Sequence, residues 1–142
     1  MKTTITIFIS LLFLIQACAV KKIMNETIIN SPETSEPIFV VVEDMPSFQG
    51  GDINSFKEWV QERVVYPKSL LRMKVEGKVF VMFIVEPDGT VSDVNIMRGL
   101  HPKLDEETIR VVKSSPPWKP GLQRGAAVRV RFSITTEYTL ID

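Results

Sequence analysis

The chain has 142 residues, of which 44% are hydrophobic and 24% charged, a composition typical of a globular protein with one domain. Its seventeen basic and seventeen acidic residues cancel, so no net field recruits nucleic acid or an anionic membrane surface. The local basic excess at Arg124, Arg129 and Arg131 is too sparse to track a phosphate backbone. We therefore exclude nucleic-acid binding.

The N-terminus has the pattern of an exported protein. Lys2 precedes an apolar run over residues 5–15, which predicts a secretory signal peptide over residues 1–17. Residues 14–18, Leu-Ile-Gln-Ala-Cys, resemble a bacterial lipobox, in which the cysteine is diacylated and begins the mature chain. We predict lipid attachment at Cys18, the single cysteine of the chain. Two alternatives stay open: an unmodified cysteine, and an uncleaved apolar membrane anchor.

Residues 18–37 are mostly polar, contain two prolines and lack a periodic apolar pattern. This composition predicts a flexible tether rather than a packed element. Such a tether spans roughly 25 Å, enough to hold a domain near a membrane but not to carry it across a compartment. The folded domain is predicted over residues 38–142.

The domain begins with a β-branched run over residues 37–43, which predicts a short strand or an extended arm. Apolar residues then recur at helical spacing over residues 53–64, with Asp52 as a suitable N-cap. Pro67 ends this helix, because the residue before a proline is forced out of the helical region. Residues 69–73 are predicted to form one further turn.

Two strands and a second helix follow. Residues 78–85 are apolar on both faces, which predicts a central strand or one covered on both sides. Residues 87–89, Pro-Asp-Gly, predict a tight turn with Gly89 at positive φ, and residues 91–98 return as a second strand. A helix is predicted to start near Pro102, a residue suited to the first helical turn.

A proline-rich loop and a long strand end the chain. The prolines of residues 116–121 exclude a helix there. Trp118 in this loop is predicted to pack on the sheet, the alternative being an exposed surface that stacks on a ligand. Residues 126–140 alternate apolar and polar side chains, so one face of this strand is buried. The order of elements predicts an α+β fold, a small antiparallel three-stranded sheet with two packed helices.

The sequence predicts neither an enzyme nor a cofactor or metal site. His101 is the single histidine and is expected at the surface beside the helix start. Asp105, Glu106 and Glu107 occupy adjacent helical positions that point in different directions. We expect these carboxylates to stabilise the helix end rather than to form a catalytic pair. No Cys-x-x-Cys or His-x-x-His spacing and no glycine-rich phosphate loop occurs.

The turn and cap signals follow a specific order along the chain. They are Tyr66-Pro67, Glu76-Gly77-Lys78-Val79, Pro87-Asp88-Gly89-Thr90-Val91, Leu104-Asp105-Glu106-Glu107, Trp118-Lys119-Pro120-Gly121 and Gly125. Together with residues 43–51, this series resembles the C-terminal domain of TonB, most closely the version found in Bacteroidetes-like bacteria. The resemblance implies a helix-strand-strand-helix-strand domain that is not an enzyme and that grips partner proteins through a sheet edge.

The resemblance also implies the gripping surface. In this family the last strand takes the N-terminal "TonB box" of an outer-membrane transporter as an added strand. By position, the surface comprises Val65, Tyr66, Pro67, Val128, Arg129, Val130, Arg131, Ser133, Thr135 and Glu137. Arg129 and Arg131 either bind partner carboxylates or form a solvated face that discourages aggregation. The implied partners are TonB-dependent transporters or other envelope proteins, and a homodimer is a further candidate.

The tether departs from the family pattern. The resemblance implies that full TonB proteins carry a long transmembrane helix followed by an extended Pro-rich spacer, and this sequence shows neither pattern. We therefore expect a lipid-anchored, periplasm-facing protein, on the outer rather than the inner membrane, that engages its partners by β-strand addition in TonB-dependent transport. One alternative is a full energy transducer with an uncleaved anchor coupled to an ExbB–ExbD-type motor. The other is a structural envelope lipoprotein that reuses the fold.

Overall fold

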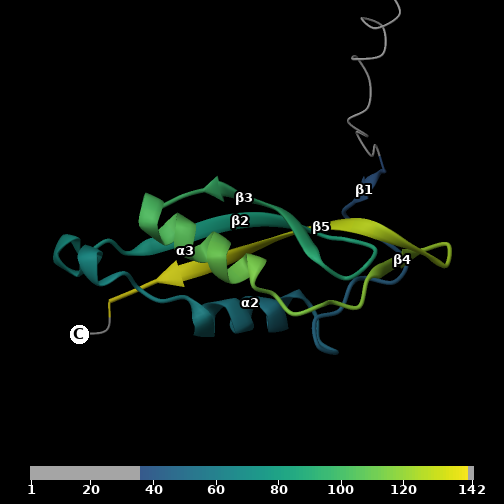
Figure 1. Ribbon diagram of the computed structural model, residues 1–142, viewed down its shortest axis with the longest axis horizontal. Helices are drawn as coiled ribbons and strands as arrows, with labels where there is room; N and C mark the ends of the chain where they lie inside the picture. Colours follow the sequence, from purple (N-terminus) through teal and green to yellow (C-terminus); the bar gives the residue numbers. More distant parts are fainter. Residues whose placement is uncertain (1–35, 141–142) are drawn as a thin grey trace, which may run out of the picture. The chain divides into compact units, whose positions relative to one another are not determined.

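The computed structural model describes residues 36–140 (Figure 1). The predicted signal peptide, the lipid-attachment residue Cys18 and the tether as far as residue 35 lie outside the described residues. The elements are β1 (Ile38–Phe39), α2 (Ile53–Arg63), the 3-10 helix η1 (Lys68–Met73), β2 (Gly77–Val85), β3 (Val91–Arg98), α3 (Pro102–Lys113), β4 (Gly121–Gln123) and β5 (Ala126–Tyr138).

Both helices begin at side-chain caps. The Asp52 carboxylate accepts hydrogen bonds from the backbone N–H groups of Asn54 and Ser55, at 2.9 and 3.3 Å, which confirms the predicted cap of α2. The ring of His101 accepts from the N–H of Lys103 at 3.2 Å, so this histidine caps α3 rather than serving only as a loop residue. Both helices therefore start where the sequence placed them.

The sheet has the order β1-β5-β2-β3, with β4 paired to β5 (Figure 1). The central strand β2 runs antiparallel to β3 and to β5, and its register with β5 runs from Gly77↔Tyr138 to Val85↔Val130. The central position of β2 confirms the prediction from its two apolar faces. The α+β class is also confirmed.

The predicted count of three strands was too low. The short strand β1 adds in parallel at Arg129 and Val130 of β5, and β4 forms an antiparallel hairpin with the start of β5. Arg124 and Gly125 turn this hairpin, both at positive φ (52° and 76°), as tight hairpin turns require. The short strand predicted over residues 37–43 is confirmed as β1, whereas the three residues of β4 are too few to show a two-residue period.

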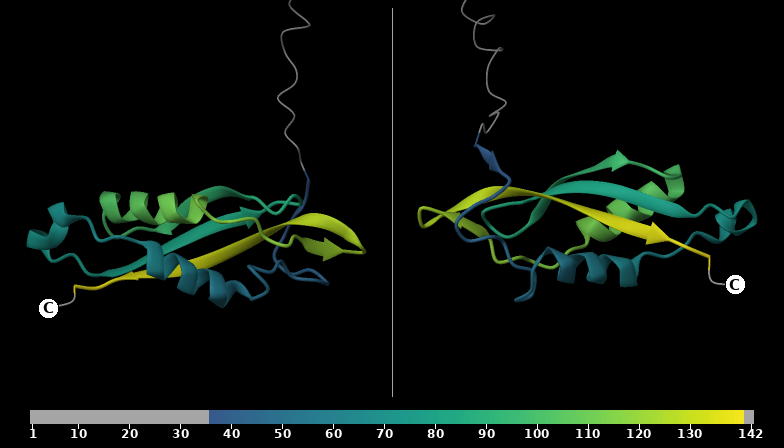
Figure 2. Two further views of the ribbon diagram at one scale, coloured as in Figure 1. Left: turned by 60° about the horizontal axis from the view of Figure 1, so that its bottom comes forward. Right: turned by 180° about the vertical axis from the view of Figure 1, so that it is seen from behind.

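The core lies between the helices and one face of the sheet. Phe56 and Val60 of α2 and Val111 and Val112 of α3 pack against Val81 and its neighbours on β2. Helix α3 contacts β3 and β2, whereas α2 contacts β5 (Figure 2). The two helices thus cover one face, and α2 lies along the strand that the sequence analysis placed at the gripping edge.

Trp118 is at the centre of an aromatic cluster. It is 4% exposed, and its ring centroid lies 4.9 Å from that of Phe56 and 5.2 Å from that of Phe48. Its indole N–H donates to Ser115 Oγ at 2.9 Å, and its backbone N–H donates to Gly89 O at 2.8 Å. The predicted packing of Trp118 on the sheet is therefore confirmed.

Gly89 connects this loop to the β2–β3 turn. Its φ is +85°, as predicted, and a Cβ atom there would lie 2.2 Å from the carbonyl oxygen of Trp118. Any side chain would collide with backbone, so the turn requires glycine twice over, for conformation and for space. The β2–β3 turn is thereby fixed against the loop that leads into β4.

Candidate functional site

The carboxylates near the start of α3 have structural partners. Asp105 accepts from the N–H of Leu100 at 2.9 Å. Glu107 binds the Arg110 guanidinium at 2.7 and 2.8 Å and accepts from the N–H of Val65 at 2.9 Å. Across residues 36–140, no group of three or more histidine, cysteine, aspartate or glutamate side chains could hold a metal ion. Asp105 and Glu107 therefore serve contacts that stabilise the start of α3 and the Val65 corner.

The outer edge of β5 follows from its pairing with β2. In an antiparallel pair, alternate residues direct their N–H and C=O groups toward the neighbouring strand and away from it. The backbone N–H and C=O groups of Glu137 both bond to the side chain of Gln61, so these two groups point away from β2. The register between β5 and β2 continues without a shift, so the backbone groups of Thr135 and Ser133 also point away from β2. These residues line the edge that a new strand would join.

Part of that edge already has partners within the chain. β1 pairs in parallel with Arg129 and Val130 on this edge, whereas β4 pairs with Val128 on the side of β5 that faces β2. The expectation of a free rim is therefore wrong at Arg129 and Val130, where β1 occupies the edge, and the backbone groups of Val128 point into the β4 hairpin instead. By contrast, the outward backbone groups of Ser133 and Thr135 have no hydrogen-bond partner among residues 36–140.

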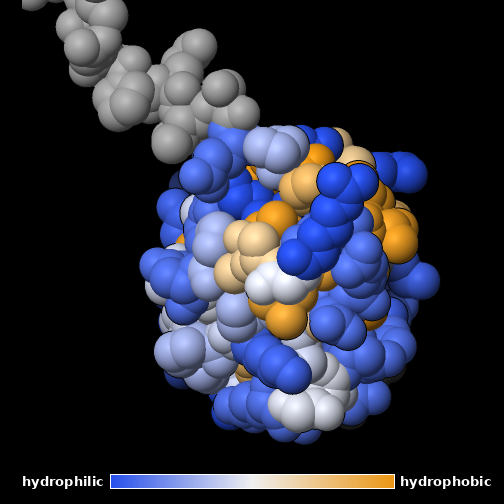
Figure 3. Space-filling model, turned by 90° about the vertical axis from the view of Figure 1, so that its right-hand side faces the viewer, coloured by the Kyte–Doolittle hydropathy of each residue, from blue (hydrophilic) through white to orange (hydrophobic). Residues whose placement is uncertain are grey.

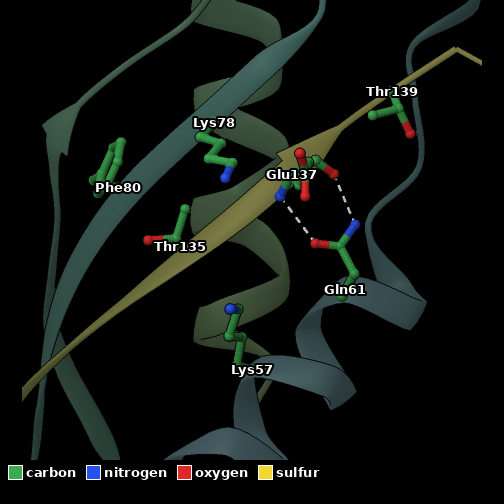
Figure 4. Close-up of a pocket in the computed structure, with 7 residues that line it drawn as sticks. All are labelled: Lys57, Gln61, Lys78, Phe80, Thr135, Glu137 and Thr139. Atoms are coloured by element: carbon green, nitrogen blue, oxygen red, sulfur yellow. Dashed lines mark hydrogen bonds between the residues drawn. The ribbon is translucent and has the colours of Figure 1, made fainter.

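A groove runs along the C-terminal part of β5 (Figure 4). Its volume is about 490 Å³, and its walls are Lys57, Gln61, Lys78, Phe80, Thr135, Glu137 and Thr139. Lys57 and Gln61 come from α2, whereas Lys78 and Phe80 come from β2. Neither lysine forms an ion pair with any residue of the described domain. Two amines beside open backbone groups favour an extended segment that carries carboxylates.

Arg129 and Arg131 differ in their surroundings. Arg129 donates two hydrogen bonds to Glu86, both of 2.9 Å, and one of 3.4 Å to Asp93. Burial acts to raise the pKa of Glu86, but hydrogen bonds from Arg129 and Ser92 outweigh it and hold that pKa below its usual value. Arg131 is exposed and forms no ion pair within residues 36–140. The charge of Arg129 is thus paired with carboxylates of the domain itself, whereas that of Arg131 is not.

The corner formed by Val65, Tyr66 and Pro67 lies beside the end of β5. The Tyr66 ring is 6.3 Å from the Tyr138 ring between centroids, and the Tyr66 hydroxyl donates to Val75 O at 2.9 Å. Val65 is 65% exposed, and its N–H is bound by Glu107. The corner therefore presents an apolar side chain on a backbone that α3 holds in place.

The pH dependence of stability tests the attachment of this corner. Hydrogen bonds from Arg110 hold the pKa of Glu107 below its ordinary value of 4.5 against the effect of burial, and the Val65 N–H adds to this lowering. The ionised form therefore stabilises the fold above that value, and the contribution is lost as pH falls through the folded pKa. We expect the midpoint of thermal unfolding to fall less for Glu107→Gln than for the parent between about pH 5 and pH 3. Equal losses in the two proteins would contradict this assignment.

A second surface lies at the end of the domain that carries β1 and β4. Figure 3 shows apolar areas there, divided by polar side chains. Val40 and Val41, which follow β1, are 64% and 77% exposed. This surface adjoins the part of the β5 edge that is already paired. Fewer unpaired backbone N–H and C=O groups are therefore available there to a new strand than beside the groove.

Lys57 and Gln61 were not among the residues predicted for the site. Both lie on the polar side of an amphipathic helix, where a lysine and a glutamine carry no functional signal. Gln61 and Glu137 are 76 positions apart in the chain, and their contact arises only from the packing of α2 along β5. The i, i+4 spacing of the two residues was the only available hint that they share a face.

The chain is similar to a known family and to solved domains. A family model described as Gram-negative bacterial TonB protein C-terminal matches residues 62–140, more than half of the chain. Two solution structures of the Helicobacter pylori TonB C-terminal domain are similar, with 21% and 23% identity, covering 61% and 67% of this chain and 91% and 90% of theirs, at TM-scores of 0.46 and 0.48. The Pseudomonas aeruginosa domain is 15% identical over 76% of this chain and 97% of its own, with a TM-score of 0.47. No curated protein sequence matches the chain.

Proposed function

The chain belongs to the Gram-negative bacterial TonB protein C-terminal family, and on this premise we propose that its domain binds an extended segment of an envelope protein along the β5 edge. The family is a non-enzymatic protein-interaction module of the cell envelope. The observation that carries the proposal is the unpartnered backbone of Ser133 and Thr135 beside the groove. An added strand would satisfy these groups, and side chains on alternate residues would supply specificity.

The proposed partners are the N-terminal segments of outer-membrane TonB-dependent transporters. Lys57, Lys78 and Arg131 are three cations without an ion pair in the described domain, and they favour a segment with acidic residues. The groove has two lysines and one carboxylate, that of Glu137, and this excess of positive charge raises the rate of encounter with such a segment more than it raises the final affinity. Val65, Tyr66 and Pro67 would contact the segment where it passes the end of β5.

A lipid on Cys18 would hold this domain at a membrane surface facing the periplasm, and we favour the outer membrane. This part of the proposal depends on residues 1–18 of the sequence alone. Within residues 36–140, no helix has the length and apolar character to span a membrane. Mass spectrometry of the mature N-terminus separates the alternatives: a diacylated Cys18 excludes the energy transducer, and an intact Met1 excludes the lipoprotein.

Binding is tested with the unit Glu36–Asp142, which contains every buried core residue of the described domain. We expect N-terminal peptides of transporters from the same bacterium to shift the amide NMR signals of Ser133 and Thr135. Shifts should be smaller on β3, at the opposite edge of the sheet, and absent with a scrambled peptide of the same composition. No binding by calorimetry and NMR would favour the structural lipoprotein. Shifts centred on β3 would move the site to the other edge.

A further inference from the structure

The side chain of Gln61 pairs with the β5 edge as a strand residue would. Its amide nitrogen donates to the carbonyl oxygen of Glu137 at 2.7 Å, and its amide oxygen accepts from the N–H of Glu137 at 2.9 Å (Figure 4). A carboxamide offers one donor and one acceptor side by side, the same pair that a backbone residue offers across a hydrogen-bonded β-pair. Gln61 thus occupies one full pairing position.

We propose that Gln61 is a latch that closes the C-terminal end of the β5 edge, and that a partner strand must displace it to pair with Glu137. The proposal rests on the proposed function, because it concerns which strands the same edge accepts. One N–H and one C=O of Glu137 cannot serve two partners in the same geometry. A strand that ends beside Thr135 leaves the latch closed, whereas a longer strand has to open it.

The latch can open without a change in the fold. Phe56 and Val60 anchor α2 in the core and are 0% exposed, so the helix itself stays in place. Gln61 is exposed, and both of its hydrogen bonds to Glu137 lie at the surface. Rotation of one exposed side chain, a motion of picoseconds to nanoseconds, is enough to free Glu137.

The latch comes from a helix and not from a strand. Gln61 and Lys57 lie on α2, one turn apart, and α2 packs along β5. We infer that α2 sets how far along β5 a partner strand can extend.

Hydrogen exchange tests the latch without a partner. In Gln61→Met, which keeps a similar length and helix propensity, the amide of Glu137 should exchange about tenfold or more faster than in the parent. The amides of Thr136 and Tyr138, which point toward β2, should keep their protection. Lys57→Met is the matched control, since it removes a groove side chain one turn earlier and leaves both Gln61 hydrogen bonds intact. Unchanged exchange at Glu137 in Gln61→Met would overturn the proposal.

Peptide affinity tests the competition. With a transporter N-terminal peptide long enough to reach Glu137, Gln61→Met should bind about three- to tenfold more tightly, because two exposed hydrogen bonds need not be broken first. A peptide shortened from the end that lies beside Glu137 should bind the parent and Gln61→Met equally. Equal affinity of both proteins for the long peptide overturns the latch. Failure of every variant to bind any peptide instead overturns the proposed function, so the two failures are distinct.

Discussion

Replacement of Trp118 by alanine is expected to lower the free energy of unfolding by about 3–5 kcal/mol. The side chain is 4% exposed and contacts the rings of Phe48, Phe56, Phe83 and Phe132, with centroid distances from 4.9 to 6.0 Å. Its removal leaves a cavity that no neighbour fills and takes away the donor to Ser115 Oγ. Domains of this size have stabilities of about 5–15 kcal/mol, so the loss is a large part of the total.

Urea denaturation followed by circular dichroism measures this change. Trp59 provides the matched control, because it joins the same cluster but is only partly buried and stacks on Phe56 at the helix surface. We expect Trp59→Ala to cost clearly less than Trp118→Ala. If the two variants lost the same stability, Trp118 would not be the centre of the core.

Replacement of Ser133 by proline is expected to weaken binding of a transporter peptide at least tenfold. Proline removes the N–H that a partner strand would use and places a ring carbon in the path of that strand. The N–H of Ser133 points away from β2, so the substitution leaves the internal pairing of the sheet intact. Proline is tolerated at such outward positions of an edge strand, and the fold should therefore persist.

Two control variants separate loss of the backbone donor from loss of the side chain and from unfolding. Ser133→Ala keeps the backbone donor and should bind as the parent does. Ile134→Pro lies one residue further on, where the N–H pairs with β2, and should unfold the domain or lower its stability sharply. Parent-like affinity in a folded Ser133→Pro protein would show that partners do not add to this edge.

The sequence was sufficient for the two helices and the three long strands because each of them has a local cause. The helical spacing after Asp52, the tight turn at Gly89 and the alternation of residues 126–140 depend on neighbouring residues, and the structure confirms all three. The long final strand is buried on one face from Val130 to Tyr138. Its first residue, Ala126, is exposed, because the strand there extends beyond the helices into the β4 hairpin.

The sequence was not sufficient to show which part of the final strand is open. That depends on β1 and Gln61, two contacts made by segments distant in the chain. A strand of two residues and one polar helical side chain add backbone-like pairing without any pattern that distinguishes them from loop or surface residues. Ser133 and Thr135 were among ten predicted residues, and only tertiary packing separates them from Arg129 and Val130.

The position of β2 between β3 and β5 has a consequence for the order of folding. β2 and β3 are joined by a tight turn, so their pairing closes a short loop and needs only local contacts. β2 meets β5 across the whole of α3 and the proline loop, with Gly77 opposite Tyr138, so this pairing carries a much larger closure entropy. We therefore expect β5 to join the sheet late. A partner that recognises β5 on the sheet would thus select chains whose folding is complete, and an unfinished domain would present no continuous edge to capture.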